Sequence, residues 1–175
     1  MKFIGKRKML IAALTVGFLF QQSAVMNAQA TDITGIEGNN GIYNIDPEGI
    51  KGDIGFRHYG NFVLSEGDIA NLIFKYGKEN VEKFVNLVDH TININGIVNS
   101  MRDGNFYDGH AIFISPNGMV VGSSGVLNVG SLSVYTPSQN DYKKYIDSNY
   151  EGDISNLAKG NADVTISGKV LSRGD

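Results

Sequence analysis

Residues 109–136 contain the feature that most restricts the fold, namely three short apolar runs separated by turn-forming residues. The runs are Ala111 to Ile114, Met119 to Val121 and Val126 to Val134. Runs this short, rich in Ile and Val and bounded by Pro, Asn, Gly or Ser, predict β-strands. The segment Ser115-Pro116-Asn117-Gly118 predicts a tight corner, because proline fixes its own φ and glycine accepts a positive φ. The region is therefore expected to form a coil of short strands joined by corners.

An internal repeat points to the architecture. Residues 92–100 and 164–172 share the pattern apolar-x-apolar-polar-Gly-x-Val-x-Ser. Ile112 to Gly118 is a looser copy, and the step from Gly96 to Gly118 is 22 residues. Such self-similarity predicts stacked units, each unable to bury its apolar face alone. We therefore predict an all-β fold, a right-handed parallel β-helix with an N-terminal cap and short excursions outside the helix.

The segment from Ile112 to Leu132 also resembles the signature of the two-partner-secretion domain of filamentous haemagglutinins and related large exoproteins. That family typically shows an N-P-N-G-I corner followed by an L-N-V-G-G/S-L strand. Here Ser115 stands in place of the first Asn, and Met119 stands in place of Ile. Phe62 to Leu64 and Ile94 to Ile97 follow the family's order of elements, so the resemblance covers roughly residues 41–136. The chain has no clear copy of the family's N-P-N-L tetrapeptide, and its pattern is closest to the leukotoxin-like adhesins.

The resemblance implies a function in export. It implies that an outer-membrane β-barrel transporter recognises residues 31–175 through periplasmic modules, and that the domain then nucleates β-helix folding outside the cell. It further implies a secreted or cell-surface protein, of which these residues are the N-terminal part. The implied secretion motif is Ser115, Pro116, Asn117, Gly118, Leu127, Asn128 and Val129. Two alternatives remain open: an exported β-helical polysaccharide-active enzyme, and an adhesive β-helix that binds the host-cell surface directly.

The first 30 residues are predicted to be a signal peptide. Four basic residues, the last of them Lys8, precede an apolar block from Met9 to Phe20. Ala28-Gln29-Ala30 is a small-x-small cleavage site, so the mature chain is expected to begin at Thr31. The apolar block is shorter than the roughly 20 residues that a membrane-spanning helix needs.

Composition restricts the partners. Residues 1–30 hold four of the 15 lysines and arginines and none of the 18 acidic residues, which leaves a formal charge of −7 on the rest. An acidic surface argues against nucleic acid as a partner, because phosphate binding needs Lys and Arg. The chain has no cysteine. This absence suits a polypeptide that crosses a pore unfolded, although compositional drift explains it equally well.

The other segments carry weaker patterns. Residues 31–64 are expected to form the cap. The spacing of Ile69, Leu72, Ile73 and Tyr76 suits a helix, but the family resemblance implies a strand over residues 68–74, which we favour. The spacing of Val81, Phe84, Val85 and Val88 predicts a short helix over residues 79–87. Residues 135–156 are polar and rich in tyrosine, and are expected to leave the coil and return near Ile154. The repeat resumes over residues 160–172.

The residues that could carry chemistry are few and scattered. His58, His90 and His110 stand in separate turn regions, and the sequence has no pattern of a nucleophile or metal site. Asp103 to Gly109 has the wrong ligand spacing for a calcium loop. We therefore predict no catalytic residue, no metal, no cofactor and no enzymatic activity. Arg173-Gly174-Asp175 spells an integrin-recognition triplet, which is more often chance than function.

Overall fold

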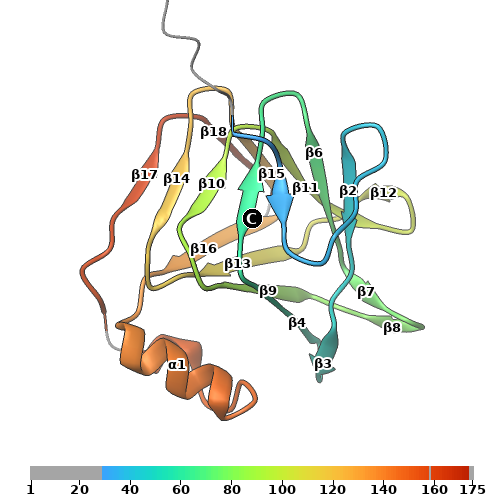
Figure 1. The fold of residues 1–175 in the computed structure, drawn as a ribbon. Helices are drawn as coiled ribbons and strands as arrows, with labels where there is room; N and C mark the ends of the chain where they lie inside the picture. The colour runs from blue at the N-terminus through green and yellow to red at the C-terminus, as the bar shows by residue number, and fades with distance from the viewer. Residues whose placement is uncertain (1–28, 158, 174–175) are drawn as a thin grey trace, which may run out of the picture.

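Three β-sheets wind around a common apolar interior in the computed structural model, which describes residues 29–157 and 159–173 (Figure 1). Each circuit of the chain passes through sheet B, then sheet C, then sheet A. The result is a parallel β-solenoid of about three turns. The predicted all-β parallel β-helix is therefore confirmed.

Most strands belong to one of the three sheets. Sheet A contains β1 (Asp32–Ile33), β5 (Phe62–Leu64), β10 (Ile92–Ile94), β14 (Met119–Val121) and β17 (Val164–Ile166). Sheet B contains β2 (Ile42–Ile45), β6 (Ile69–Ile73), β11 (Ile97–Arg102), β15 (Val126–Val129) and β18 (Lys169–Ser172), with β12 (Asn105–Phe106) paired to β11. Sheet C contains β3 (Gly49–Lys51), β4 (Ile54–Tyr59), β9 (Lys83–Val88), β13 (His110–Ile114) and β16 (Ser131–Tyr135). A hairpin of β7 (Lys75–Tyr76) and β8 (Glu79–Asn80), helix α1 (Gln139–Asp147) and a 3-10 turn η1 (Ile154–Asn156) lie between these strands.

The register of the strands confirms one prediction about the internal repeat and contradicts another. Residues 92–100 and 164–172 occupy matching positions, since β10 and β17 both pair with β14, and β11 and β18 both pair with β15. The predicted step of 22 residues is wrong. Ile97 aligns with Val126, so the glycine before it, Gly96, corresponds to Gly125 and not to Gly118. Gly96 and Gly118 stand at different corners of the solenoid.

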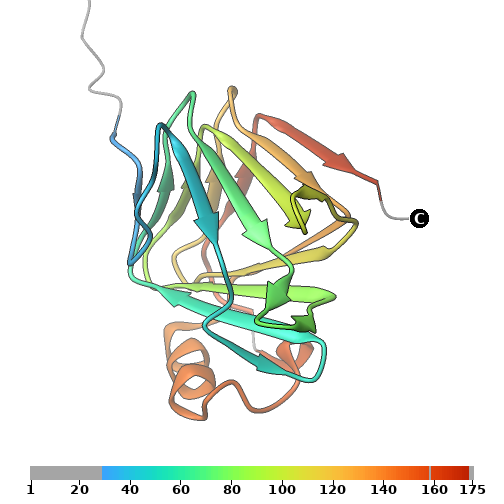
Figure 2. The same cartoon turned by 90° about the vertical axis from the view of Figure 1, so that its right-hand side faces the viewer.

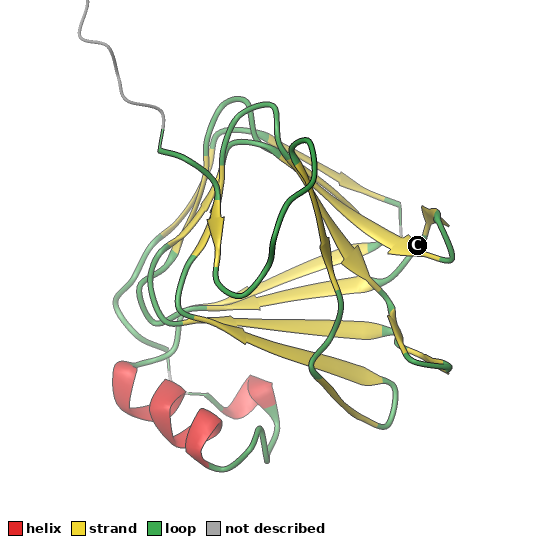
Figure 3. Ribbon diagram, turned by 45° about the vertical axis from the view of Figure 1, so that its right-hand side comes forward, coloured by secondary structure: helices red, strands yellow, loops and turns green. Residues whose placement is uncertain are grey.

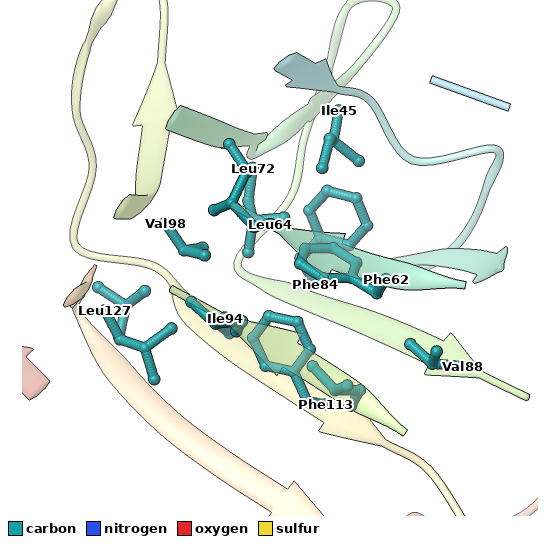
Figure 4. Packing of buried hydrophobic residues seen from close by; sticks show 14 of the residues in the cluster. Ile45, Phe62, Leu64, Leu72, Phe84, Val88, Ile94, Val98, Phe113 and Leu127 are labelled. Carbon is teal, nitrogen blue, oxygen red and sulfur yellow. The ribbon is translucent and has the colours of Figure 1, made fainter. Parts of the chain in front are cut away.

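The interior of the solenoid is filled by aliphatic and aromatic side chains from all three sheets (Figure 4). Phe62 of sheet A and Phe113 of sheet C meet edge to face, with ring centroids 5.5 Å apart. Leu72, Val98 and Leu127 of sheet B complete the same cluster and are fully buried. Because strands stack in register, each inward side chain packs against its counterparts in the turns above and below.

A second apolar core lies on the outer face of sheet C. Phe56, Val85 and Ile112 are buried there beneath Tyr142 and Tyr145 of α1. Figure 2 shows the helix lying beneath the sheet that contains β3 and β4, and Figure 3 shows the helices on that one side of the solenoid. The predicted excursion thus includes a helix, and the chain rejoins the sheets at Val164, later than the expected return near Ile154.

The second core also explains an incorrect prediction. Residues 79–87 do not form a helix, because Lys83–Val88 is strand β9, paired in parallel with β4 and β13. One face of β9 lines the interior and the other is covered by α1, so Phe84 and Val85 are both fully buried. A strand that is buried on both faces loses the alternation by which strands are recognised. The strand predicted over residues 68–74 is confirmed as β6.

Residues 31–64, which follow the predicted cleavage site, combine two kinds of pairing. β1 and β3 run antiparallel to β5 and β4. β2, β4 and β5 instead pair in parallel with strands of the following turn. The region predicted as a cap therefore includes strands of the solenoid itself, while β1 and β3 supply the antiparallel pairing.

Because the docking of α1 buries Tyr145, we predict that the folded protein loses stability at alkaline pH. Burial, followed by the nearby Tyr150 and Asp153, raises the pKa of Tyr145 from 10.0 to about 12. Tyrosine in the unfolded chain ionises near its ordinary pKa, so this stabilisation is complete below pH 10 and is lost as the pH rises toward 12. Tyr145→Phe should reduce the fall in unfolding free energy between about pH 9 and pH 11.5 by up to about 1 kcal/mol.

Urea denaturation at the two pH values measures this effect. Tyr76→Phe is the matched control, because the Tyr76 side chain is exposed and lies far from α1 in the chain. An identical pH dependence in wild type and Tyr145→Phe would show that the Tyr145 hydroxyl does not couple docking to pH.

Candidate functional site

The corner that joins β13 to β14 is built around Ser115. This residue is 1% exposed, and its Oγ donates to His90 O at 2.8 Å while accepting the Asn117 N–H at 3.1 Å. The Gly118 N–H donates to Ser115 O at 3.3 Å and closes the turn. A serine hydroxyl can accept a bond from the residue two positions later, as an asparagine side chain does. Ser115 can therefore replace the asparagine of the family pattern without loss of the turn.

The corner is also tied to the preceding turn of the solenoid. Asn117 Nδ2 donates to Asp89 O at 2.6 Å, and Thr91 Oγ1 donates to Asn117 O at 3.1 Å. The Ile92 N–H donates to Gly118 O at 3.0 Å. The backbone and side chain of Asn117 thus connect two successive corners, although Asn117 itself is exposed.

Gly118 is required at this corner for two reasons. Its φ is +84°, a conformation that residues with a side chain rarely adopt. A Cβ at this position would lie 2.3 Å from Asp163 O, which belongs to the next corner in the stack. The same carbonyl accepts the Met119 N–H at 3.1 Å, so it cannot withdraw without loss of a hydrogen bond between turns.

The second part of the predicted motif lies on another sheet. Leu127 and Val129 of β15 are fully buried in the interior, and Asn128 points to the opposite face of sheet B. Ser115 to Gly118 and Leu127 to Val129 therefore do not converge on one pocket. The first group shapes a corner between sheets C and A, and the second supplies core and surface contacts of sheet B.

Asn128 belongs to a ladder of asparagines that runs along the outside of sheet B. Asn71 Nδ2 donates to Asn44 Oδ1 at 2.9 Å, Asn99 Nδ2 to Asn71 Oδ1 at 3.1 Å, and Asn128 Nδ2 to Asn99 Oδ1 at 3.1 Å. Asn128 Oδ1 is buried and has no hydrogen-bond partner among the described residues, because β18 places Leu171 next to it. Sequence reasoning named Asn128 but missed Asn44, Asn71 and Asn99. Their spacing of 27, 28 and 29 residues was the available signal.

Helix α1 is fastened beside the corner by polar contacts. Gln139 Nε2 donates to Asn117 Oδ1 at 3.2 Å, and the Tyr142 hydroxyl donates to Asp89 Oδ1 at 3.1 Å. His58 Nε2 lies 2.7 Å from the same carboxylate oxygen. Burial raises the pKa of Tyr142, and Asp89 adds to the shift. The hydroxyl therefore stays protonated and remains a donor to Asp89.

The histidines do not gather into a catalytic group. His58 contacts Asp89, His90 Nδ1 lies 2.9 Å from Gly60 O, and His110 Nε2 lies 2.8 Å from Ser133 Oγ. Burial, together with the charge of Lys83, lowers the pKa of His110. Within residues 29–157 and 159–173, no group of three or more His, Cys, Asp or Glu side chains could hold a metal ion.

The predicted processing site is only partly described. Ala28 lies outside the described residues, and Ala30 is exposed. Thr31 Oγ1 accepts the Ser65 N–H at 2.8 Å and donates to the Asp68 carboxylate. None of the described helices is both long and apolar enough to cross a membrane.

The triplet at residues 173–175 is also described only in part. Gly174 and Asp175 lie outside the described residues. The Arg173 guanidinium lies over the Phe106 ring, 4.6 Å from its centroid.

Comparison with protein-family profiles, curated proteins and solved structures found no significant match for this chain. The class of protein that the structure defines is the β-solenoid. The seven residues of the secretion motif remain a prediction from the sequence resemblance.

A pair of glycine substitutions tests the steric role of the Asp163 carbonyl. Gly118 and Gly67 have nearly equal φ values, +84° and +87°, but a Cβ at Gly67 would meet no atom within 4 Å. Gly67→Ala should cost about 1–2 kcal/mol of unfolding free energy through backbone strain alone. Gly118→Ala should cost about 1–3 kcal/mol more, because the Asp163 corner must also shift. Urea denaturation of the two variants measures the difference, and equal losses would contradict the proposed close approach.

Proposed function

We propose that residues 31–175 are the secretion-recognition domain of an exported, filamentous haemagglutinin-like adhesin. The proposed partner is an outer-membrane β-barrel transporter whose periplasmic modules bind the chain before it folds. The observation that carries the proposal is the position of the signature-like segment. Residues 112–132 contribute to strands of all three sheets, β13 and the start of β16 in sheet C, β14 in sheet A and β15 in sheet B, and include the glycine corner between β13 and β14. The segment that resembles a secretion signature therefore also contributes to the stacking of the turns.

Strand addition offers a physical mechanism for recognition. An unfolded chain can add as a strand to an exposed sheet edge, where main-chain hydrogen bonds give affinity and alternate side chains give selection. The motif supplies such an alternation, since Leu127 and Val129 share one face and Asn128 lies on the other. The glycines that form the corners in the folded state have no side chain, so they do not hinder strand addition by the extended chain.

After export, the chain would fold outside the cell by stacking one turn of the solenoid on another. In a solenoid each turn buries the apolar face and pairs the strand edge of its neighbour, so folding can propagate from turn to turn. In this chain β10 covers β5, and β14 then covers β10. The absence of cysteine leaves no disulfide-closed loop to obstruct passage through a pore.

The proposed role is non-catalytic. The asparagine amides that repeat on the outside of sheet B do not serve as general acids or bases at neutral pH. The three histidines contact different partners on different turns. A polysaccharide-active enzyme would need titratable groups that converge in one groove. Direct adhesion to host cells would be a separate property of the folded surface.

Secretion by a co-expressed transporter tests the proposal. The chain is expressed in a Gram-negative host together with a β-barrel transporter of the two-partner-secretion class, and the secreted and periplasmic fractions are quantified. Gly118→Val should lower the secreted fraction at least about tenfold, which corresponds to about 1.4 kcal/mol in the competition between export and retention. Gly67→Val is the control, because it brings the same backbone strain without a change in the motif.

A binding measurement separates recognition from folding. The chain is held unfolded in urea, and its affinity for the purified periplasmic modules is compared with that of a variant in which Leu127, Asn128 and Val129 are replaced by Ser. Weaker binding of the variant supports recognition of this strand. Equal binding, together with undiminished secretion of Gly118→Val, would reject the proposed function.

A further inference from the structure

Thr31, the first residue of the predicted mature chain, is bound at the corner that joins β5 to β6. Its Oγ1 accepts the Ser65 N–H at 2.8 Å and donates to the Asp68 carboxylate. The two residues that follow it form β1 and pair with β5. The point at which the signal peptide is expected to be cut is therefore fixed on the surface of the solenoid.

The backbone of the corner holds the Asp68 carboxylate in a defined position. The Asp68 N–H donates to Ser65 O at 3.2 Å, and Asp68 O accepts the Ile97 N–H of the next turn at 2.9 Å. The carboxylate lies against Gly41, where a Cβ would come within 2.8 Å of its Oδ1. Asp68 is half-buried, and it forms no ion pair with a side chain of residues 29–157 and 159–173.

The charge of the surrounding segment favours an added cation. Residues 31–68 contain seven acidic residues and two basic ones, which gives a formal charge of −5. The two basic residues are engaged elsewhere, since Lys51 donates to Asn149 O and Arg57 donates to Asp46 O at 3.1 Å. A positive charge placed beside Asp68 would therefore be attracted by its carboxylate and by the excess negative charge of the segment.

Cleavage after Ala30 would create such a charge. Hydrolysis of the Ala30–Thr31 peptide bond adds one water, leaving a carboxylate on Ala30 and an α-amino group on Thr31, which is protonated below its ordinary pKa of about 7.7–8.0. The Thr31 nitrogen is three bonds from Oγ1, so it lies within about 6 Å of the carboxylate that Oγ1 contacts. Cleavage also removes Gln29, whose carbonyl oxygen accepts the Ser65 hydroxyl, and so releases Ser65 Oγ as an acceptor.

We propose that Ser65 and Asp68 form a binding site for the α-ammonium group of Thr31, so that removal of the signal peptide stabilises the attachment of β1 to the solenoid. The inference depends on the predicted cleavage after Ala30 and not on recognition by a transporter. Before cleavage, Thr31 contributes only its hydroxyl to the corner, and after cleavage it contributes a charge as well. Processing thereby stabilises the first turn, on which the following turns stack.

Two forms of the chain beginning at Thr31 separate the charge from the hydroxyl. One has a free α-amino group, and the other is acetylated there by a co-expressed N-terminal acetyltransferase, which removes the charge and keeps the side chain. In urea denaturation at about pH 6.5, Asp68→Asn should raise the unfolding equilibrium constant about two- to fivefold more in the free form than in the acetylated form. Glu79→Gln is the control, because Glu79 is an exposed carboxylate on the β7–β8 hairpin and should act equally in both forms.

The pH dependence provides a measurement that a purely structural role of Asp68 would not change. The NMR signal of the Asp32 N–H follows the titration of the adjacent α-amino group. Its midpoint should lie about 0.3–0.7 pH units lower in Asp68→Asn than in the wild type, which is the same two- to fivefold factor. The stabilisation is complete below the unfolded-state pKa and is lost as the pH rises through the folded-state pKa, so the excess effect of Asp68→Asn should disappear near about pH 10.

The N-terminus itself is checked by intact mass after the full chain is expressed with residues 1–30 and recovered from the periplasm. The mass should correspond to a chain that begins at Thr31. The proposal is overturned if the processed chain begins at another residue, if Asp68→Asn destabilises the free and acetylated forms equally at about pH 6.5, or if the titration midpoint does not respond to Asp68→Asn. None of these measurements involves a transporter, so their outcome is separate from that of the secretion experiment.

Discussion

The stacking of short parallel strands in register is the constraint on which the rest of this structure depends. A strand of three to six residues cannot hold itself in place, and its inward side chains become buried only when equivalent side chains lie above and below. The corners, like the strands, have to stack directly on the equivalent corners of the neighbouring turns. At the corner before sheet B, a Cβ on Gly168 would lie 2.1 Å from Gly125 O, and a Cβ on Gly125 would lie 2.4 Å from Ile94 O. The turns approach one another so closely there that only glycine fits.

Side-chain amides extend the same register to the outer surface. The ladder from Asn44 to Asn128 can form only if each asparagine stands directly above the previous one, so its hydrogen bonds favour this register over a slipped one. Sheet C uses another solution on its outer face, where an apolar row is covered by α1 and the segment after it. That covering layer ties the helix to the Asn117 corner and leaves a cleft at its other end.

The fold was predictable from the sequence because corners leave strong local signals. Pro116, Asn117 and Gly118 have conformational preferences that act within a few residues, and the short Ile- and Val-rich runs between such corners define the strands. The period was harder to read, since the excursions between strands differ in length and the loose copy at Ile112 belongs to a different corner from Gly96. The strand β9 escaped recognition because α1 buries its outer face, a tertiary contact that has no local signature. Three rungs of the asparagine ladder were missed because each rung depends on a partner almost thirty residues away.

The register of the strands can be tested most directly by cross-linking, since the chain contains no cysteine of its own. Asn71 and Asn99 are paired neighbours on adjacent strands, so the Cα atoms of cysteines at these positions would lie about 4.8 Å apart. This distance is within the range that a disulfide can bridge. Asn71 and Asn128 are separated by the intervening strand, at about 10 Å, which is beyond that range. At low protein concentration, oxidation should form an intramolecular bond in Asn71→Cys/Asn99→Cys and none in Asn71→Cys/Asn128→Cys. A bond in the second variant, or its absence in the first, would contradict the stacked register from which this account is built.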